Sequence, residues 1–394
     1  MIDELKKFCE FGRETVCSET FCPALNRSIP TFTNEFWTAK QRAAHSLHEI
    51  SYRACFKPQL PRFFIERLTL PGEAVYDPFM GRGTTPVEAA LLGRTPYGCD
   101  VNPLCAMLTK PRLAPPDEVS IERHIAALDL HYDGTIPEEL LVFYHPDTLR
   151  ELCALRRRFA GPRLSPEDEW VRMISLNRLT GHSAGFFSIY TLPPNQAVSV
   201  SSQRKINQKR GQVPEYRNVR NLILRKSRVL WKDCAGAIPF FMGDPVMLSH
   251  SCEHTPEIRS NSVRLIVTSP PFLDVVDYRQ DNWLRNWFAS IDSDALKITI
   301  EATPHGWQSA MTRIFHELYR VLCPGGFLAF EVGEVRQGKL HLEDLVLPAG
   351  IAAGLTPELL LINVQKFTKT AQCWGVDNGS KGTNTNRIVL FRKS

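Results

Sequence analysis

The chain has 394 residues, 43% of them hydrophobic and 23% charged, which predicts a globular protein with one large interrupted domain or two domains. No run approaches about 18 apolar residues, and the first residues lack the layout of a secretory signal. We therefore expect neither a membrane-spanning helix nor a secretory leader. The net charge of +5 is too small to indicate a polyanionic partner by itself.

The eleven cysteines contain no CxxC pair, and Cys252 and His254 lack the further ligands that a zinc site needs. We expect free thiols, no metal and a protein of the reducing cytoplasm.

After a mixed N-terminal segment, residues 1–45, strand and helix patterns alternate. The expected elements are a helix at 60–68, a strand at 74–77, a glycine-containing loop at 78–85, a helix at 86–92 and a strand at 95–100 that ends in an acid. This order predicts the opening of a parallel α/β sheet.

The alternation stops at residues 112–237, which are polar, helical in pattern and basic. Within them, residues 199–232 contain ten basic residues and one acidic residue. Such a cluster predicts contacts with phosphates, although a solvated helix face would have the same composition. The amide side chains of the loop YTLPPNQ, residues 190–196, suit base edges, but the loop could equally be a rigid turn. The DNA-binding candidates are Asn195, Arg204, Lys205, Lys209, Arg210, Arg217, Arg220, Arg225, Lys226 and Arg228.

The α/β pattern resumes after the insert. We expect strands at 240–244, 262–268, 327–332, 359–367 and 387–391, and a helix at 312–322. The prediction is one α/β domain made of residues 46–111 and 238–394, interrupted by a basic, mainly helical insert.

The loop DPFMGRGTT, residues 77–85, combines two features of a cofactor site. Gly81 and Gly83 would let the backbone approach a ligand, and the following helix would present amide groups to a carboxylate. Asp100, which lies 17 residues after Gly83, is placed to accept hydrogen bonds from ribose hydroxyls. No GxxxxGK run is present, so the sequence does not support NTPase chemistry.

The second motif, TSPPF, follows an apolar strand. Its two prolines remove N–H donors and leave carbonyl oxygens exposed, which suits an amino group better than an anion. The Ser269 hydroxyl and the Pro270 carbonyl could draw an exocyclic amine toward a tetrahedral shape, while Phe272 could stack on an extruded base.

Together these two motifs resemble those of the amino-methyltransferases of DNA, which make N4-methylcytosine or N6-methyladenine. The resemblance extends to Phe56-Lys57-Pro58, to Asp244 and to Pro324-Gly325-Gly326, and it implies a Rossmann-like methyltransferase fold that uses S-adenosylmethionine without a metal. It implies that the base is held by Ser269, Pro270, Pro271 and Phe272. The implied cofactor residues are Phe56, Lys57, Pro58, Asp77, Phe79, Gly81, Gly83, Thr84, Thr85, Asp100, Asn102, Asp244 and Thr268.

The resemblance also implies a substrate. Adenine enzymes mostly carry an acid where this chain has Ser269, so cytosine N4 in double-stranded DNA is the expected target, with a cognate restriction endonuclease as a possible partner. Adenine N6, an RNA base and an inactive DNA-binding protein remain alternatives. The insert lies earlier in this chain than the target-recognition region of most family members, so its role in recognition rests on its charge.

Overall fold

The computed structural model describes residues 1–38, 44–53, 55–161, 163–192, 197–234, 241, 243–271, 278–296, 303–332, 334–335, 340–364 and 385–394. In chain order its elements are α1 (Ile2–Lys6), β1 (Val16–Cys22), η1 (Pro23–Leu25), β2 (Arg27–Asn34), η3 (Ser46–His48), α2 (Gln59–Leu68), β3 (Ala74–Asp77), α3 (Thr84–Leu91), β4 (Thr95–Cys99), α4 (Pro103–Leu113), α5 (Glu118–Ala127), η4 (Glu138–Val142), α6 (Pro146–Phe159), α7 (Pro166–Arg178), α8 (Val200–Arg210), α9 (Val219–Trp231), β5 (Val246–Leu248), β6 (Val263–Thr268), α10 (Tyr278–Ala289), α11 (Pro304–Val321), β7 (Leu322–Val332), β8 (Glu334–Val335), β9 (Leu340–His341), α12 (Glu343–Ala352), β10 (Thr356–Val364) and β11 (Thr385–Arg392).

A nine-stranded sheet forms the centre of one half of the molecule, with the strand order β1-β2-β10-β11-β7-β6-β3-β4-β5. The strands β7, β6, β3, β4 and β5 pair in parallel, whereas β11 runs antiparallel to both of its neighbours. The predicted α/β class with a mostly parallel sheet is therefore confirmed. Among the described residues, no helix is both long and apolar enough to cross a bilayer.

Helices cover both faces of the sheet because successive strand residues point to opposite sides. On β6, Ile266 packs into the cluster that includes α11 and α12, while Leu265 and Val267 pack into the cluster that includes α2. The strand β6 is therefore buried on both faces, which explains its nearly continuous apolar sequence.

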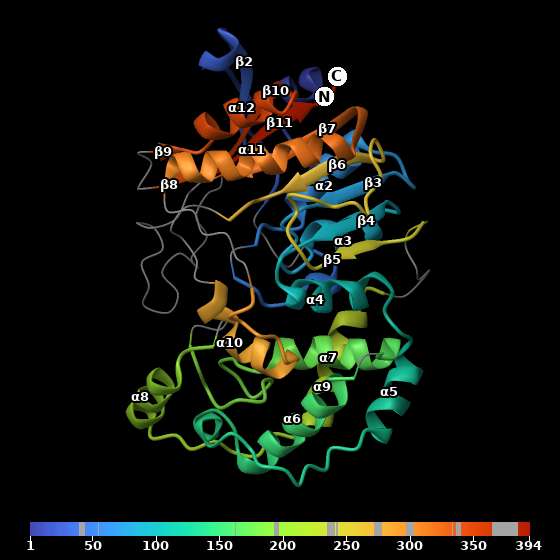
Figure 1. Ribbon diagram of the computed structural model, residues 1–394, viewed down its shortest axis with the longest axis vertical. Helices are drawn as coiled ribbons and strands as arrows, with labels where there is room; N and C mark the ends of the chain where they lie inside the picture. The colour runs from blue at the N-terminus through green and yellow to red at the C-terminus, as the bar shows by residue number, and fades with distance from the viewer. Residues whose placement is uncertain are drawn as a thin grey trace.

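The predicted helical insert forms a second half of the molecule, built from α5 to α9 around an apolar cluster that also includes residues of α3, α4 and α10. Figure 1 shows the sheet in the upper half, these helices in the lower half, and α4 and α10 between them. At its centre Trp170 stacks on Trp231 with ring centroids 5.4 Å apart. The helix α10 follows β6 in sequence but packs against α6, and Arg156 donates to the Trp287 carbonyl at 2.7 Å.

The N-terminal segment is part of the sheet rather than a separate unit. Its strand β2 pairs in parallel with β10 near the other end of the chain, and β1 forms the edge of the sheet.

One strand prediction is wrong. The sequence predicts a strand at 240–244 that ends at Asp244, but the structure has its strand at Val246–Leu248. Asp244 is exposed and precedes β5, so it lies at the amino end of a parallel strand, away from the carboxyl ends where the site forms.

Candidate active site

The carboxyl ends of three neighbouring parallel strands bring the predicted motifs together. Asp77 ends β3, Asp100 follows β4, and Ser269 follows β6. Because β6, β3 and β4 are adjacent and parallel, these residues share one edge of the sheet.

Asp77 ties the glycine loop to the catalytic strand. Its Oδ1 accepts a hydrogen bond from the Thr268 hydroxyl at 2.6 Å and another from the Phe79 amide at 3.0 Å. Burial raises the pKa of Asp77 to about 7, although these hydrogen bonds oppose the shift. Its Oδ2 is buried without a partner among the described residues. Asp77 and Thr268 therefore connect the glycine loop to the strand β6 and do not themselves line the pocket.

Asp100 holds the shape of the glycine loop. Its Oδ2 accepts from the Gly81 amide and its Oδ1 from the Asn102 amide, each at 3.0 Å. Asn102 in turn caps α4 by accepting from the Leu104 amide. Gly81 has a φ of +49°, a conformation that favours glycine.

Gly83 is required by packing and does not line the pocket. Its φ is +76°, and a Cβ there would lie 2.2 Å from the Thr109 hydroxyl on α4. Thr84 accepts from Arg82, and Thr85 donates to the Val267 carbonyl at 3.1 Å, so both threonines fix α3 against its surroundings.

The proline corner is anchored from α11. The Pro271 carbonyl accepts from the Trp307 indole at 2.9 Å, and Pro270 is buried. The predicted stacking residue Phe272 lies outside the described residues.

One pocket joins the glycine loop to the proline corner. It holds about 1050 Å³ of empty space, counting the part that opens to solvent. Its lining residues are Tyr52, Pro78, Phe79, Gly81, Asp100, Val101, Asn102, His250, Ser251, Cys252, Glu253, Ser269, Pro271, Trp307, Ala310, Met311 and Ile314. The predicted residues Phe79, Gly81, Asp100, Asn102, Ser269 and Pro271 are thus brought together around one space.

Glu331, which the sequence analysis missed, touches the catalytic corner. Pairing of Thr268 with Phe330 in the parallel strands β6 and β7 brings Ser269 and Glu331 side by side. The Glu331 carboxyl is buried and accepts hydrogen bonds from Asn386 and Ser269. Burial raises its pKa to about 7, although both hydrogen bonds oppose the shift.

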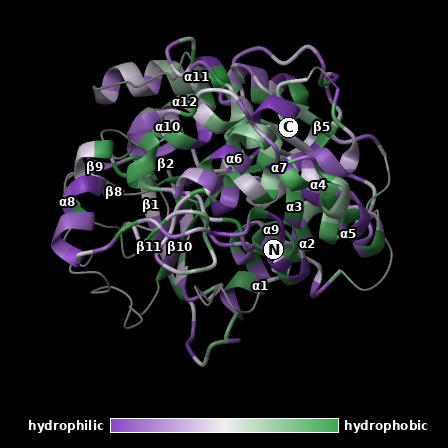
Figure 2. Ribbon diagram, turned by 90° about the horizontal axis from the view of Figure 1, so that it is seen from below, coloured by the Kyte–Doolittle hydropathy of each residue, from purple (hydrophilic) through white to green (hydrophobic). Residues whose placement is uncertain are grey.

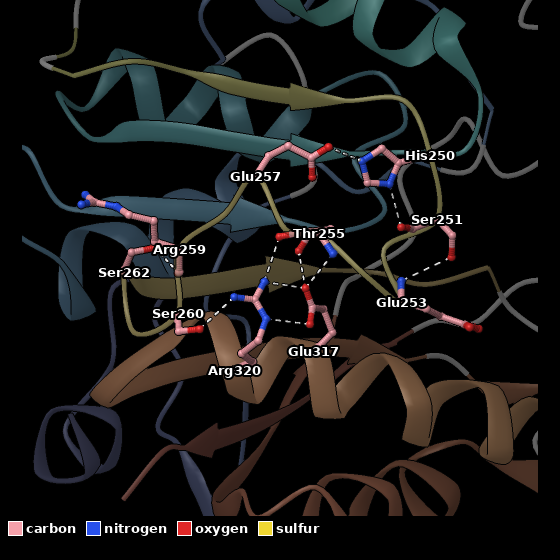
Figure 3. Close-up of polar contacts among 10 residues, drawn as sticks. All are labelled: His250, Ser251, Glu253, Thr255, Glu257, Arg259, Ser260, Ser262, Glu317 and Arg320. Atoms are coloured by element: carbon pink, nitrogen blue, oxygen red, sulfur yellow. Dashed lines mark hydrogen bonds and ion pairs between the residues drawn. The ribbon is translucent and has the colours of Figure 1, made fainter.

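A second missed wall is the loop after β5, which contributes His250 and Glu253 to the pocket. Figure 3 shows how this loop is fastened to α11. The amide and hydroxyl of Thr255 both donate to Glu317 at 2.7 Å, and Arg320 bonds Glu317 and the Thr255 carbonyl. Although burial opposes it, these hydrogen bonds lower the pKa of Glu317 to about 2.

Four other predicted residues lie away from this pocket. Phe56 packs against the aromatic cluster around α2, and Pro58 precedes that helix. Lys57 lines a separate cavity, and Asp244 lies before β5.

The basic segment is divided between α8 and α9. Figure 2 shows α8 as hydrophilic along most of its length, and its Arg204, Lys205 and Lys209 are exposed. Arg210 lies over the Tyr190 ring, with 3.8 Å between the guanidinium carbon and the ring centroid. Asn195 lies outside the described residues.

On and before α9, three of the predicted DNA-binding cations have partners within the protein. Arg217 pairs with Glu215 at 3.6 Å. Arg220 donates to the Ala126 and Leu128 carbonyls, and Arg228 pairs with two glutamates of α5. Arg225 and Lys226 face the cavity that Lys57 lines.

Residues 26–110 match the sequence model of a protein family described as DNA methylase. This part of the chain is therefore similar to the DNA methylase family. The match includes the glycine loop and Asp100, and the predicted resemblance to S-adenosylmethionine-dependent DNA amino-methyltransferases is confirmed at the level of the family.

Three relatives are type II methyltransferases. Identity is 35% over 111 residues to M.MvaI of Kocuria varians, covering 27% of this chain and 23% of that protein. It is 32% over 74 residues to M.MjaII of Methanocaldococcus jannaschii, covering 19% and 14%. It is 21% over 304 residues to M.BsoBI of Geobacillus stearothermophilus, covering 68% and 57%. The chain thus matches less than two thirds of the length of each of these methylases.

Replacing Gly83 with alanine should destabilise the α/β domain by about 2 kcal/mol or more, because the residue has a positive φ and its Cβ would collide with Thr109. Gly211→Ala is the matched control, since Gly211 has a φ of +59° but open space around it. Denaturant unfolding of both variants measures the difference. Equal losses would show that the contact with Thr109 is unimportant.

Replacing Glu317 with glutamine should reduce the free energy of unfolding by about 1–3 kcal/mol, because charged hydrogen bonds to Arg320 and Thr255 are lost. Since folding lowers the pKa of Glu317 from 4.5 to about 2, its contribution is present above pH 4.5 and disappears as the pH falls toward 2. The difference in the free energy of unfolding between wild type and Glu317→Gln should therefore shrink as the pH falls. Glu257→Gln, which removes an exposed pair with His250, should cost less than about 1 kcal/mol; a loss as large as that of Glu317→Gln would contradict the assignment.

Proposed function

We propose that this protein transfers a methyl group from S-adenosylmethionine to the exocyclic amino group of a base flipped out of double-stranded DNA, with cytosine N4 as the target. The observation that supports it is the single pocket that Gly81, Asp100, Ser269 and Pro271 line together. Because the relatives are type II methyltransferases, we include a restriction endonuclease of the same specificity as a partner and the cytoplasm as the location.

The pocket fits the proposed cofactor by its chemistry. Each Asp100 oxygen accepts one backbone hydrogen bond, which leaves lone pairs for the hydroxyls of a ribose. Phe79, Met311 and Ile314 supply apolar surface for a flat heterocycle. When bound, S-adenosylmethionine supplies an electrophilic methyl group whose sulfur keeps the electron pair of the broken bond.

Ser269 and its neighbours hold the amino group that receives the methyl. The Ser269 hydroxyl donates to the ionised Glu331 carboxylate, so its oxygen lone pairs remain free to accept from the amine. With the Pro270 carbonyl as a second acceptor, the nitrogen is turned away from conjugation with the ring, and its lone pair attacks the methyl carbon. Most of the rate enhancement then comes from positioning.

Glu331 also accounts for the proton. After transfer the nitrogen carries one proton more than the product amine. That proton passes to the Ser269 oxygen as the serine proton passes to Glu331, which restores the hydroxyl and leaves Glu331 neutral. A carboxyl with a pKa of about 7 can accept this proton and release it again near neutral pH.

DNA of cells that express the wild-type protein should contain N4-methylcytosine, measured by mass spectrometry of nucleosides, and DNA of cells that express Ser269→Ala should not. In vitro the variant should lose about 10²-fold in kcat, because the contact to the amine and the proton path to Glu331 are removed, while its affinity for S-adenosylmethionine stays near that of wild type. N6-methyladenine would overturn the assignment of the base. Methylated RNA with unmodified DNA, or a variant as active as wild type, would overturn the function.

The pH dependence of kcat should identify the proton acceptor. In wild type kcat should rise with pH through an apparent pKa of about 7, because only the ionised Glu331 orients Ser269 and accepts a proton. Glu331→Gln should lower kcat by about 10²-fold and abolish this rise. Asp77→Asn is the matched comparison, since Asp77 also has a pKa of about 7 but bonds Thr268. A rise that persists in Glu331→Gln and disappears in Asp77→Asn would contradict the role of Glu331.

A further inference from the structure

A second cavity lies between the sheet and the helical half of the molecule. It encloses about 2050 Å³ of empty space, counting the part open to solvent. Residues 49–52, Cys55, Lys57 and Arg82 form its wall on the sheet side, and Arg178 of α7 and one face of α9 form the opposite wall. Tyr52 lines both this cavity and the pocket that contains Ser269, so the two spaces are neighbours.

The charges around this cavity are strongly unbalanced. Lys57, Arg82, Arg178, Arg225 and Lys226 line it, and Glu49 is the one carboxylate among its lining residues. Glu49 lies 3.4 Å from the amino group of Lys226. Burial, together with the positive charge of Arg178, lowers the pKa of Lys226 to about 8, as expected where cations crowd together.

The polar contacts of these cations leave positive charge for a ligand. Arg82 is buried and donates to the backbone carbonyls of His48 and Ile50, which do not neutralise it. Arg178 donates to the neutral amide of Asn177 and lies over the Phe186 ring. Among the described residues, Arg225 makes neither a hydrogen bond nor an ion pair, and it is exposed.

The cations of α9 lie on two different faces of the helix and have different surroundings. Residues 222, 225, 226 and 229, at the spacing of one helix face, line the cavity. Arg228 faces α5 instead, where it pairs with Glu122 at 2.5 Å and with Glu118 at 3.4 Å. The helix is therefore neutralised where it packs within the protein and left positive where it borders the cavity.

The rim of the cavity allows a bulky chain to come close. Ser183, Ala184 and Gly185 form part of it, and all three side chains are small. An added Cβ at Gly185 would meet nothing nearer than the Ser183 hydroxyl at 3.6 Å. The large volume of the cavity and its open rim suit a polyanion with a sugar–phosphate backbone. A small anion would require neither a cavity of this volume nor a rim this open.

We propose that this cavity binds the phosphodiester backbone of the DNA strand that carries the target nucleotide, with Arg178, Arg225 and Lys226 contacting the phosphates that flank it. The inference rests on the proposed function for the identity of the strand. Because Tyr52 lines both cavities, a nucleotide whose base enters the pocket beside Ser269 would have its phosphates next to this wall. Backbone contacts of this kind fix the position of the duplex without reading its sequence.

The test compares Arg225→Gln with Arg228→Gln, two equal substitutions three residues apart on α9. Binding of a fluorescein-labelled DNA duplex of mixed sequence is measured by anisotropy over a range of KCl concentrations. Loss of one phosphate contact should weaken binding about tenfold at moderate salt and lower the salt slope by about 1 in Arg225→Gln. Arg178→Gln should behave in the same way, and Arg228→Gln should match wild type.

The readouts distinguish this inference from the proposed function. A wild type that methylates DNA, together with an Arg225→Gln variant that keeps the wild-type slope, would overturn the phosphate site alone. A slope that depends on Arg225 in a protein that transfers no methyl would support the site and overturn the function. Tighter binding of an RNA duplex than of the DNA duplex would overturn DNA as the occupant. Thermal unfolding controls for folding, and Arg225, being exposed, can be replaced without disturbing the core.

Discussion

The hydrogen bond between Thr268 and Asp77 joins the two halves of the active site. It links the last residue of β6 to the last residue of β3 at 2.6 Å, in a fully buried environment. One strand leads into the proline corner and the other into the glycine loop, so this contact fixes the distance between the proposed base site and the proposed cofactor site. The cost is a buried carboxyl, because burial raises the pKa of Asp77 to about 7 and its Oδ2 has no partner among the described residues. The proposed methyl transfer depends on a reacting distance held within a fraction of an ångström, which would account for a buried hydrogen bond at this place.

Besides the apolar cluster that joins α3 and α4 to the helical half, hydrogen bonds of the segment 44–53 hold the two halves together. Ser46 accepts from and donates to residues at the end of α9, Arg53 forms a two-bonded ion pair with Asp281 of α10, and Arg285 of α10 donates to the Ser51 carbonyl. The same segment carries Tyr52 and reaches the glycine loop through Arg82. The segment 44–53 therefore contributes to the walls of both cavities, and hydrogen bonds connect it to both halves of the molecule.

Much of the fold and part of the site could be predicted from the sequence, because they depend on local patterns. The strand at 74–77, the loop with Gly81 and the corner at 269–271 each carry their signal within a few adjacent residues. The strand β5 could not be located because it has three residues, and the predicted strand was placed too early, which put Asp244 at the wrong end. Glu331 lies within a correctly predicted strand, but its contact with Ser269 depends on the register between β6 and β7, which no local pattern encodes. The net charge of residues 199–232 likewise could not distinguish Arg225 from Arg228. The two residues differ because two glutamates of α5 form ion pairs with Arg228, and this depends on how the helices pack.

Tyr52 shows why the two cavities are best understood together. Its phenol is buried, and burial raises its pKa well above the usual value, with the neighbouring Cys105 and Asp100 acting in the same direction. The ring is thus a neutral partition between a space bordered by the Asp100 and Glu253 carboxylates and a space bordered by cations, with the Arg285 guanidinium 5.7 Å from its centroid. Because the ring is neutral, it adds no charge to either space, and the proposed cationic cofactor and polyanionic strand would each meet charges of opposite sign. A charged residue in place of Tyr52 would weaken the electrostatic field in one of the two cavities. A flexible residue there would remove the wall that the two cavities share, and with it a support for the proposed geometry of the amine and the methyl donor.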